Sequence, residues 1–169
     1  LDTTEPPPPW FKKAVFPVGS LRSVGFHDDA DFLLIVSEQG RGVIDCIAGQ
    51  KLAREHQEYY EDEIRLDADG IGPLAGQKVR ISGLYGGGLP NSTSDGWSVE
   101  TVTLSWPEKI LLLVEPGSWF YGSLYGQPDN FRKVFSGSEI RAKGFSPTGR
   151  TLVIATSSDL TIYTRNDVG

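Results

Sequence analysis

The chain lacks several features that mark particular protein classes. Cys46 is the only cysteine, so no internal disulfide can form, and its apolar surroundings from Val43 to Ile47 predict a buried, unreactive thiol. Long hydrophobic runs are also missing, because the longest aliphatic run, Ile110 to Val114, is far too short to cross a bilayer. We therefore expect neither a disulfide scaffold nor a membrane partner.

An excess of positive charge is lacking as well. The chain has 16 Lys and Arg against 22 Asp and Glu, a formal net charge of −6. Nucleic-acid binding requires a basic footprint, so we expect no nucleic-acid partner, whereas a basic protein partner fits this charge. There is no methionine and no signal-peptide pattern, and the chain begins at Leu1. These features lead us to expect a truncated or processed N-terminus, and they favour a cytoplasmic location.

Glycine and proline, in contrast, are plentiful, with 20 and 11 residues, and they occur in clusters. This distribution favours many short strands joined by turns, and hence an all-β fold. The length of 169 residues suits a single domain with its own core. We expect a proline-rich arm over residues 1–9, followed by one all-β domain over residues 10–169.

Segments far apart in the chain resemble one another. Residues 21–44 align without a gap with residues 140–163, and residues 104–114 align in the same way with residues 145–155. The identical pairs of the first alignment are Arg22/Arg141, Gly25/Gly144, Phe26/Phe145, Leu33/Leu152 and Ile35/Ile154. The spacing predicts repeat units of about 40 residues. We place these units near 21–55, 60–96 (diverged), 97–136 and 140–165.

Two stretches carry a resemblance to a known class of repeat. GFSPTGRTLVIATSSDLTIY (residues 144–163) and GVIDCIAGQK (residues 42–51) resemble the blades of the β-propeller repeat families, both WD40-like and quinoprotein-like. The resemblance implies about four short antiparallel sheets in a propeller-like arrangement. It rests on the pattern of strands and turns, because the Trp-Asp and Gly-His dipeptides of WD40 repeats are absent.

The last repeat unit supplies three strands before the sequence ends. Trp10 to Val18 has strand-forming residues, and we expect it to close the last blade by pairing with the strand around Leu160 to Tyr163. Such pairing would leave no open edge on that sheet. A two-sheet sandwich or a meander of similar hairpins is the alternative architecture.

Two acidic segments and a glycine-rich loop are candidates for a ligand site. Residues 27–31 (HDDAD) are interpreted as a solvated turn, because the equivalent residues 146–150 of the last repeat unit are ordinary turn residues. Residues 66–70 (LDADG) are interpreted as an Asp-Gly turn, because Ile71 and Lys78 stand where a calcium loop needs oxygen ligands. The loop 86–97 (GGGLPNSTSDGW) has neither the Lys-Ser or Lys-Thr pair nor the helix pattern of a phosphate loop. We predict no catalytic residue, no cofactor and no metal site.

The segment from Glu55 to Glu63 (EHQEYYEDE) has the most unusual composition of the chain. Residues 51–65 contain no Gly or Pro, which fits either a short helix or a strand that runs into a loop. The segment is either a solvated acidic face or a binding edge, in which carboxylates steer a basic partner and tyrosines anchor it. The candidate partner-binding residues are Glu55, Glu58, Tyr59, Tyr60, Glu61, Asp62 and Glu63.

The sequence therefore predicts a non-catalytic protein-binding module. One specific form fits a small acidic domain without a cofactor: an immunity or antidote protein that neutralises a basic toxin such as a nuclease. The alternative is a small-ligand-binding or hydrolytic domain that uses the loop 86–97 and the acidic turns. This alternative requires convergence of the carboxylates of Asp28, Asp31, Asp67 and Asp69 in one pocket.

Overall fold

The computed structural model describes residues 5–117 and 131–166. These residues form an all-β fold without an α-helix. The elements are β1 (Phe11–Pro17), β2 (Leu21–Phe26), β3 (Phe32–Ser37), β4 (Gly40–Asp45), β5 (Gln50–Glu55), β6 (Asp67–Asp69), the 3-10 helix η1 (Gly72–Leu74), β7 (Lys78–Arg80), β8 (Ser82–Gly83), β9 (Ser98–Ser105), β10 (Glu108–Val114), β11 (Phe131–Gly137), β12 (Ile140–Phe145), β13 (Thr151–Thr156) and β14 (Asp159–Thr164).

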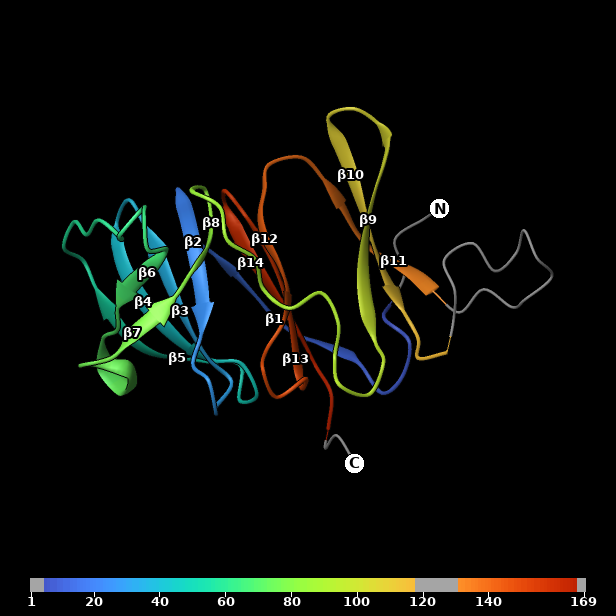
Figure 1. The fold of residues 1–169 in the computed structure, drawn as a ribbon, viewed down its shortest axis with the longest axis horizontal. Coiled ribbons are helices and arrows are strands. Elements are labelled where there is room, and N and C mark those ends of the chain that lie inside the picture. The colour runs from blue at the N-terminus through green and yellow to red at the C-terminus, as the bar shows by residue number, and fades with distance from the viewer. Residues whose placement is uncertain (1–4, 118–130, 167–169) are drawn as a thin grey trace.

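The strands form four antiparallel sheets, which we number in chain order. Sheet 1 has the order β5-β4-β3-β2-β8, sheet 2 pairs β6 with β7, sheet 3 is β11-β10-β9, and sheet 4 is β1-β14-β13-β12. In space they form a row, with sheets 2 and 1 at the left of Figure 1, sheet 4 in the middle and sheet 3 at the right. Several antiparallel sheets were expected, and this coarse prediction is confirmed.

Three hydrophobic cores join neighbouring sheets of the row. They lie between sheets 1 and 4, between sheets 4 and 3, and between sheets 1 and 2. Within the described part of the chain, no such core joins sheet 2 to sheet 3, so these residues form an open row. Cys46 is fully buried in the first of these cores, and burial raises the pKa of its thiol well above the usual value.

The aliphatic runs of β3 and β13 are continuous because both faces of each strand are buried. In β3, Leu33 and Ile35 pack toward sheet 4, whereas Leu34 and Val36 pack toward sheet 2. Alternate residues of the run 152–155 in β13 are divided in the same way, between the cores shared with sheet 1 and with sheet 3. Sheets 1 and 4 are therefore the inner layers of the row.

The N-terminal strand completes sheet 4, as the sequence predicted. β1 pairs antiparallel with β14, from Phe11 opposite Thr164 to Pro17 opposite Asp159. Trp10, just before β1, is 3% exposed, and its ring centroid lies 5.6 Å from that of Phe145 on β12. The segment before Trp10 differs from the extended arm that we expected.

In that segment, Pro6 and Pro7 are buried, and the Trp10 N–H donates a hydrogen bond to the Pro7 carbonyl over 3.0 Å. Proline rings are apolar, so burying two of them beside Trp10 offsets the entropy lost by ordering the chain. Pro6 and Pro7 therefore belong to the folded body.

The β2–β3 and β12–β13 hairpins have the same geometry. Their structurally equivalent residues are the ones that the ungapped sequence alignment matches. Their loops have the same length, and the register of both hairpins shifts at the corresponding place. The matched features are the pairs Phe26/Leu33 and Phe145/Leu152, the register shifts at Arg22 and Arg141, and the left-handed residues Ser20 and Glu139, with φ of 53° and 56°.

Two details of the predicted repeats are wrong. The β9–β10 hairpin places Leu111 opposite Thr101 and turns tightly between Ser105 and Glu108, so it lacks the longer loop of the other two hairpins. Residues 67–69 do not form the expected Asp-Gly turn, because they are the strand β6, which pairs with β7. The alignment of Leu104 with Phe145 also predicts an inward Leu104 side chain, and this side chain lies outside the described residues.

Candidate functional site

The acidic segment continues from β5 as a loop, not as a helix. It runs past sheet 1 and turns at Asp62, whose carboxylate accepts backbone N–H groups of Arg65 and Ile64 at 2.9 and 3.0 Å. These two hydrogen bonds lower the pKa of the Asp62 carboxyl, that from Arg65 the more. The turn leaves the side chains of Glu63 and Ile64 exposed, Ile64 by 93%.

Glu61 is buried, against the expectation that it steers a partner from the surface. Its side chain is 1% exposed, lies 3.2 Å from Nε of Arg22, and accepts a hydrogen bond from the Ser23 hydroxyl at 2.8 Å. The Arg22 guanidinium also donates to the Tyr59 carbonyl. A buried carboxylate is tolerated because it is paired and hydrogen-bonded. This pair fastens the acidic segment to β2.

Tyr59 and Glu55 also have structural contacts. The guanidinium carbon of Arg41 lies 3.9 Å from the centroid of the Tyr59 ring, and Arg41 pairs with Glu55 at 2.6 Å. The Tyr59 hydroxyl accepts the backbone N–H of Asp69 at 2.7 Å, which ties the segment to sheet 2. Both side chains are partly exposed and are held in place by these contacts within the fold.

Tyr60 is the exposed tyrosine of the pair, with 69% of its surface accessible. Its hydroxyl donates to the Glu58 carboxylate, and this bond, followed by the charge of Glu58, raises the pKa of Tyr60. The Arg22 guanidinium lies 5.6 Å from the centroid of its ring. One face of the Tyr60 ring is thus supported by a side chain that is itself anchored.

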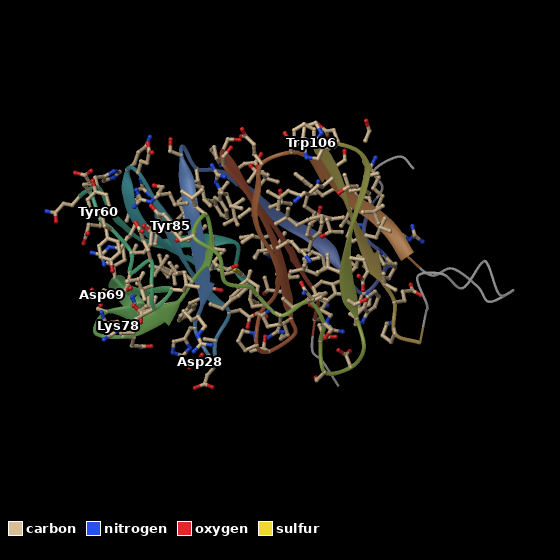
Figure 2. The ribbon with its side chains drawn as sticks, turned by 45° about the horizontal axis from the view of Figure 1, so that its top comes forward. Asp28, Tyr60, Asp69, Lys78, Tyr85 and Trp106 are labelled. Atoms are coloured by element: carbon tan, nitrogen blue, oxygen red, sulfur yellow. The ribbon has the colours of Figure 1, made fainter. Side chains whose placement is uncertain are left out.

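Two further exposed residues, Leu84 beside Arg22 and Tyr85 near Tyr60, were missed by the sequence analysis. They are 48% and 39% exposed, and the Leu84 N–H donates to the Arg22 carbonyl over 2.8 Å. Figure 2 shows Tyr60 and Tyr85 on the same part of the surface, far from Trp106. We call Tyr60, Leu84 and Tyr85 the tyrosine patch, and the exposed carboxylates Glu58, Asp62 and Glu63 the acidic ridge.

Within the described residues, the other candidate carboxylates do not form a site. No group of three or more His, Cys, Asp or Glu side chains is placed to hold a metal ion among them. Asp69 forms an exposed ion pair with Lys78 at 2.8 Å, and Figure 2 shows Asp28 apart from both. The convergence required by a hydrolytic or metal-binding site is therefore not observed there.

Asp31 is not part of a solvated turn, in contrast to our interpretation of residues 27–31. It is 7% exposed and accepts hydrogen bonds from three hydroxyls of the β12–β13 turn. The donors are Ser146, Thr148 and Thr151. This carboxylate therefore joins sheet 1 to sheet 4, whereas His27 accepts the N–H groups of Asp29 and Ala30 within its own turn.

Replacement of Asp31 by alanine is expected to lower the free energy of unfolding by about 2–4 kcal/mol. The three hydroxyls would lose their common acceptor, and a buried donor without a partner is costly. Denaturant unfolding of Asp31→Ala beside Asp28→Ala, an exposed neighbour, measures the difference. Equal stability of the two variants would contradict the structural role of Asp31.

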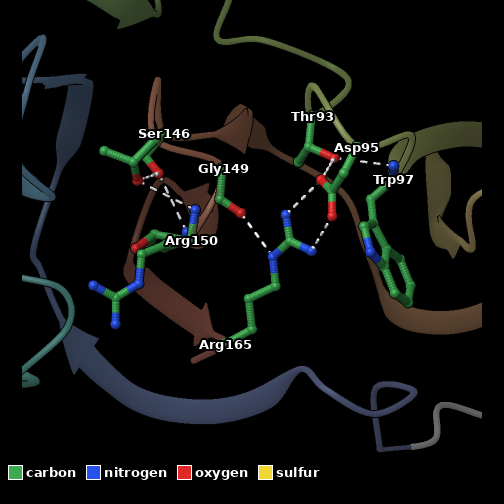
Figure 3. A network of polar contacts seen from close by, with 9 residues as sticks. Thr93, Asp95, Trp97, Ser146, Gly149, Arg150 and Arg165 are labelled. Carbon is green, nitrogen blue, oxygen red and sulfur yellow. Dashed lines mark hydrogen bonds and ion pairs between the residues drawn. The ribbon is translucent and has the colours of Figure 1, made fainter. Parts of the chain in front are cut away.

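The glycine-rich loop ends in a polar network with Arg165, the residue after β14 (Figure 3). Arg165 donates to both carboxylate oxygens of Asp95 at 2.7 Å and to the Gly149 carbonyl at 2.9 Å. The Thr93 hydroxyl donates to Asp95 and accepts the Trp97 N–H. The hydrogen bonds from Arg165 hold the pKa of Asp95 far below its usual value.

This network predicts a pH dependence of stability. A carboxyl with a lowered folded-state pKa stabilises the fold above its unfolded pKa of about 4, and this contribution is lost as the pH falls toward the folded value. At neutral pH, Asp95→Asn should lower the free energy of unfolding by about 1–2 kcal/mol. This is a low value for a charged pair, because the Asp95 side chain is 37% exposed to solvent. The difference in unfolding free energy between the variant and the wild-type protein should decrease below about pH 4. A difference that stays constant in acid would be inconsistent with the ion pair.

No protein-family model matches the chain, and no curated protein matches it. In the part of the chain that the structure describes, no helix is long and apolar enough to span a membrane. The arguments for a function are therefore the exposed surfaces and the contacts that shape them.

Proposed function

We propose that this chain is a non-catalytic protein-binding module built from propeller-like repeat units. The identical register of the β2–β3 and β12–β13 hairpins and the pairing of β1 with β14 support the propeller-like part of the proposal. The spatial order of the sheets, 2-1-4-3, is that of a four-unit ring opened between its second and third units.

The contact surface of the module is the tyrosine patch. Tyrosines offer a large contact area with few rotatable bonds, and they are enriched among the residues that hold protein interfaces together. Tyr60 carries the proposal, because most of its ring is exposed although the chain on both sides of it is fixed by buried contacts of Tyr59 and Glu61. A rigid exposed ring loses little entropy on binding.

The partner is a basic protein segment. The acidic ridge borders Tyr60, because Glu58 accepts a hydrogen bond from the Tyr60 hydroxyl, and Asp62 accepts the backbone N–H groups of Ile64 and Arg65. Opposite charge would speed the encounter with a basic segment, while the ring would slow its dissociation. The specific form of this proposal is neutralisation of a basic toxin such as a nuclease.

A random dodecapeptide library displayed on phage provides a defined probe. Selection on the wild-type protein should enrich basic sequences that carry an apolar or aromatic anchor. For a selected peptide, Tyr60→Ala should raise the dissociation rate about tenfold, whereas Tyr60→Phe should have little effect. Trp106→Ala serves as the matched control, because Trp106 is 85% exposed at a distant turn.

Charge reversal tests the acidic ridge separately. Glu58→Lys and Glu63→Lys should lower the association rate and its dependence on salt, and Glu108→Lys, on an exposed residue of β10, should not. Enrichment of acidic or uncharged peptides, or equal losses from Tyr60→Ala and Trp106→Ala, would overturn the proposal.

A further inference from the structure

The two matching hairpins differ in how they neutralise an equivalent arginine. Arg22 and Arg141 stand at the same register shift of the β2–β3 and β12–β13 hairpins. Arg22 pairs with the buried carboxylate of Glu61 at 3.2 Å. Arg141 donates from Nε to the Leu21 carbonyl at 3.3 Å, and no carboxylate of the described residues lies within ion-pair distance of it. Among the described residues, the positive charge of Arg141 is thus left without a paired carboxylate.

A cavity of about 280 Å³ lies beside Arg141, between β12, β10, β9 and the glycine-rich loop. Lys109 and Lys143 also line it, and no Asp or Glu does. Small-molecule sites are concave and combine an apolar lining with a few polar groups, and the apolar residues here are Leu89, Leu111, Ile140 and Ala142. Three cationic residues, Lys109, Arg141 and Lys143, thus line one small cavity of a protein whose net charge is −6.

Lys143 is the most unusual of the three cations. Its counterpart in the matching hairpin is Val24, which is fully buried in the core. Burial lowers the pKa of Lys143; Glu100 opposes this shift, and the positive charge of Lys109 adds to it. The Lys143 ammonium donates to Asn91 at 2.9 Å, a neutral acceptor that does not balance its charge.

Neutral hydrogen-bonding groups complete the lining. Ser82 and Thr101, which carry hydroxyls, line the cavity together with Gly87 and Gly88 of the glycine-rich loop. Gly87 has a φ of 86°, and a Cβ atom there would lie 2.6 Å from the Ile81 carbonyl, so only glycine fits this close approach. Hydroxyls, exposed loop backbone and cations are the groups that bind the oxygens of anions.

We propose that this cavity binds a small oxyanion, namely the phosphate or carboxylate group of a small molecule. The anion supplies the negative charge that Glu61 supplies to Arg22 in the matching hairpin. The cavity is separate from the tyrosine patch, so the proposal does not depend on protein binding. It also differs from a phosphate loop, because the cations come from β10 and β12 and not from a helix after the glycines.

Isothermal titration calorimetry with inorganic phosphate and with citrate, each against chloride at equal ionic strength, tests the proposal. The wild-type protein should bind at least one of the two anions, and the stronger of them identifies the preferred oxyanion. The double variant Lys109→Gln/Lys143→Gln should bind it at least about tenfold more weakly. Lys12→Gln, on an exposed residue of β1 outside the cavity, should bind it as the wild type does.

Lys109→Gln alone is the second variant, because Lys109 is exposed and its replacement should leave the fold intact even if Lys143→Gln does not. NMR shifts of the Gly87 and Gly88 amides during the titration locate the bound anion. Failure of both anions to bind beyond chloride, or an equal loss in Lys12→Gln and Lys109→Gln, would overturn the proposal. Neither result would bear on peptide binding at the tyrosine patch.

Discussion

Deletion of residues 1–18 is expected to abolish folding to a soluble monomer. The deletion removes β1, so β14 becomes an edge strand, although Leu160, Ile162 and Tyr163 on it are buried. An exposed apolar edge is a template for association with other chains. The variant should sediment as aggregate or lose the cooperative unfolding transition in the far-ultraviolet circular dichroism signal.

Trp10 provides a sharper form of the same test. Its ring packs against Trp97 and Phe145, at centroid distances of 5.9 and 5.6 Å, and Arg165 lies 4.9 Å from its centroid. Trp10→Ala should therefore lower the free energy of unfolding by about 3–5 kcal/mol. Phe11→Ala, at the adjacent position but 41% exposed, should cost less than about 1 kcal/mol. Similar losses in both variants would contradict the packing of the N-terminal segment.

Replacement of Glu61 by alanine is expected to cost about 3–5 kcal/mol, because it leaves Arg22 buried without a counter-charge. The Ser23 hydroxyl would lose its acceptor as well. Glu63→Ala is the matched control two residues away, and it should change stability by no more than about 0.5 kcal/mol because Glu63 is exposed.

The pair of variants separates two roles that the sequence could not distinguish. If Glu61 were a solvated carboxylate of the acidic segment, both variants would be equally stable, and Glu61→Ala would affect only the association rate. The structure instead predicts that Glu61→Ala lowers the midpoint of denaturant unfolding and Glu63→Ala leaves it unchanged. Urea unfolding followed by tryptophan fluorescence measures both.

The strands of sheets 1 and 4 were predictable because their signals are local. A strand buried on both faces requires an unbroken aliphatic run, and the runs 33–36 and 152–155 meet this requirement between polar turns. The pairing of β1 with β14 was also predictable, because the last unit lacked one strand. The register of the β9–β10 hairpin was not predictable from the sequence. Its apolar residues align equally well with a long turn and with the short turn that Trp106 and Pro107 form.

The site was only partly predictable, for physical reasons. Composition marked the acidic segment, but it could not tell Glu61, buried against Arg22, from Glu63, which is exposed. The environment of Asp31 depends on three hydroxyls from the other end of the chain. Tyr85 lies on the same part of the surface as Tyr60 because the chain before it, β8, pairs with the edge of β2, a pairing that no local pattern predicts.

Mapping a selected basic peptide onto the protein tests the central claim most directly. Amide chemical shifts are recorded while the unlabelled peptide is titrated into isotope-labelled protein. We predict that the largest changes fall on residues 58–64 and 84–85, and that Tyr60→Ala removes them while Trp106→Ala preserves them. Changes centred on any other surface, such as the β9–β10 turn, or changes that survive Tyr60→Ala, would contradict the account.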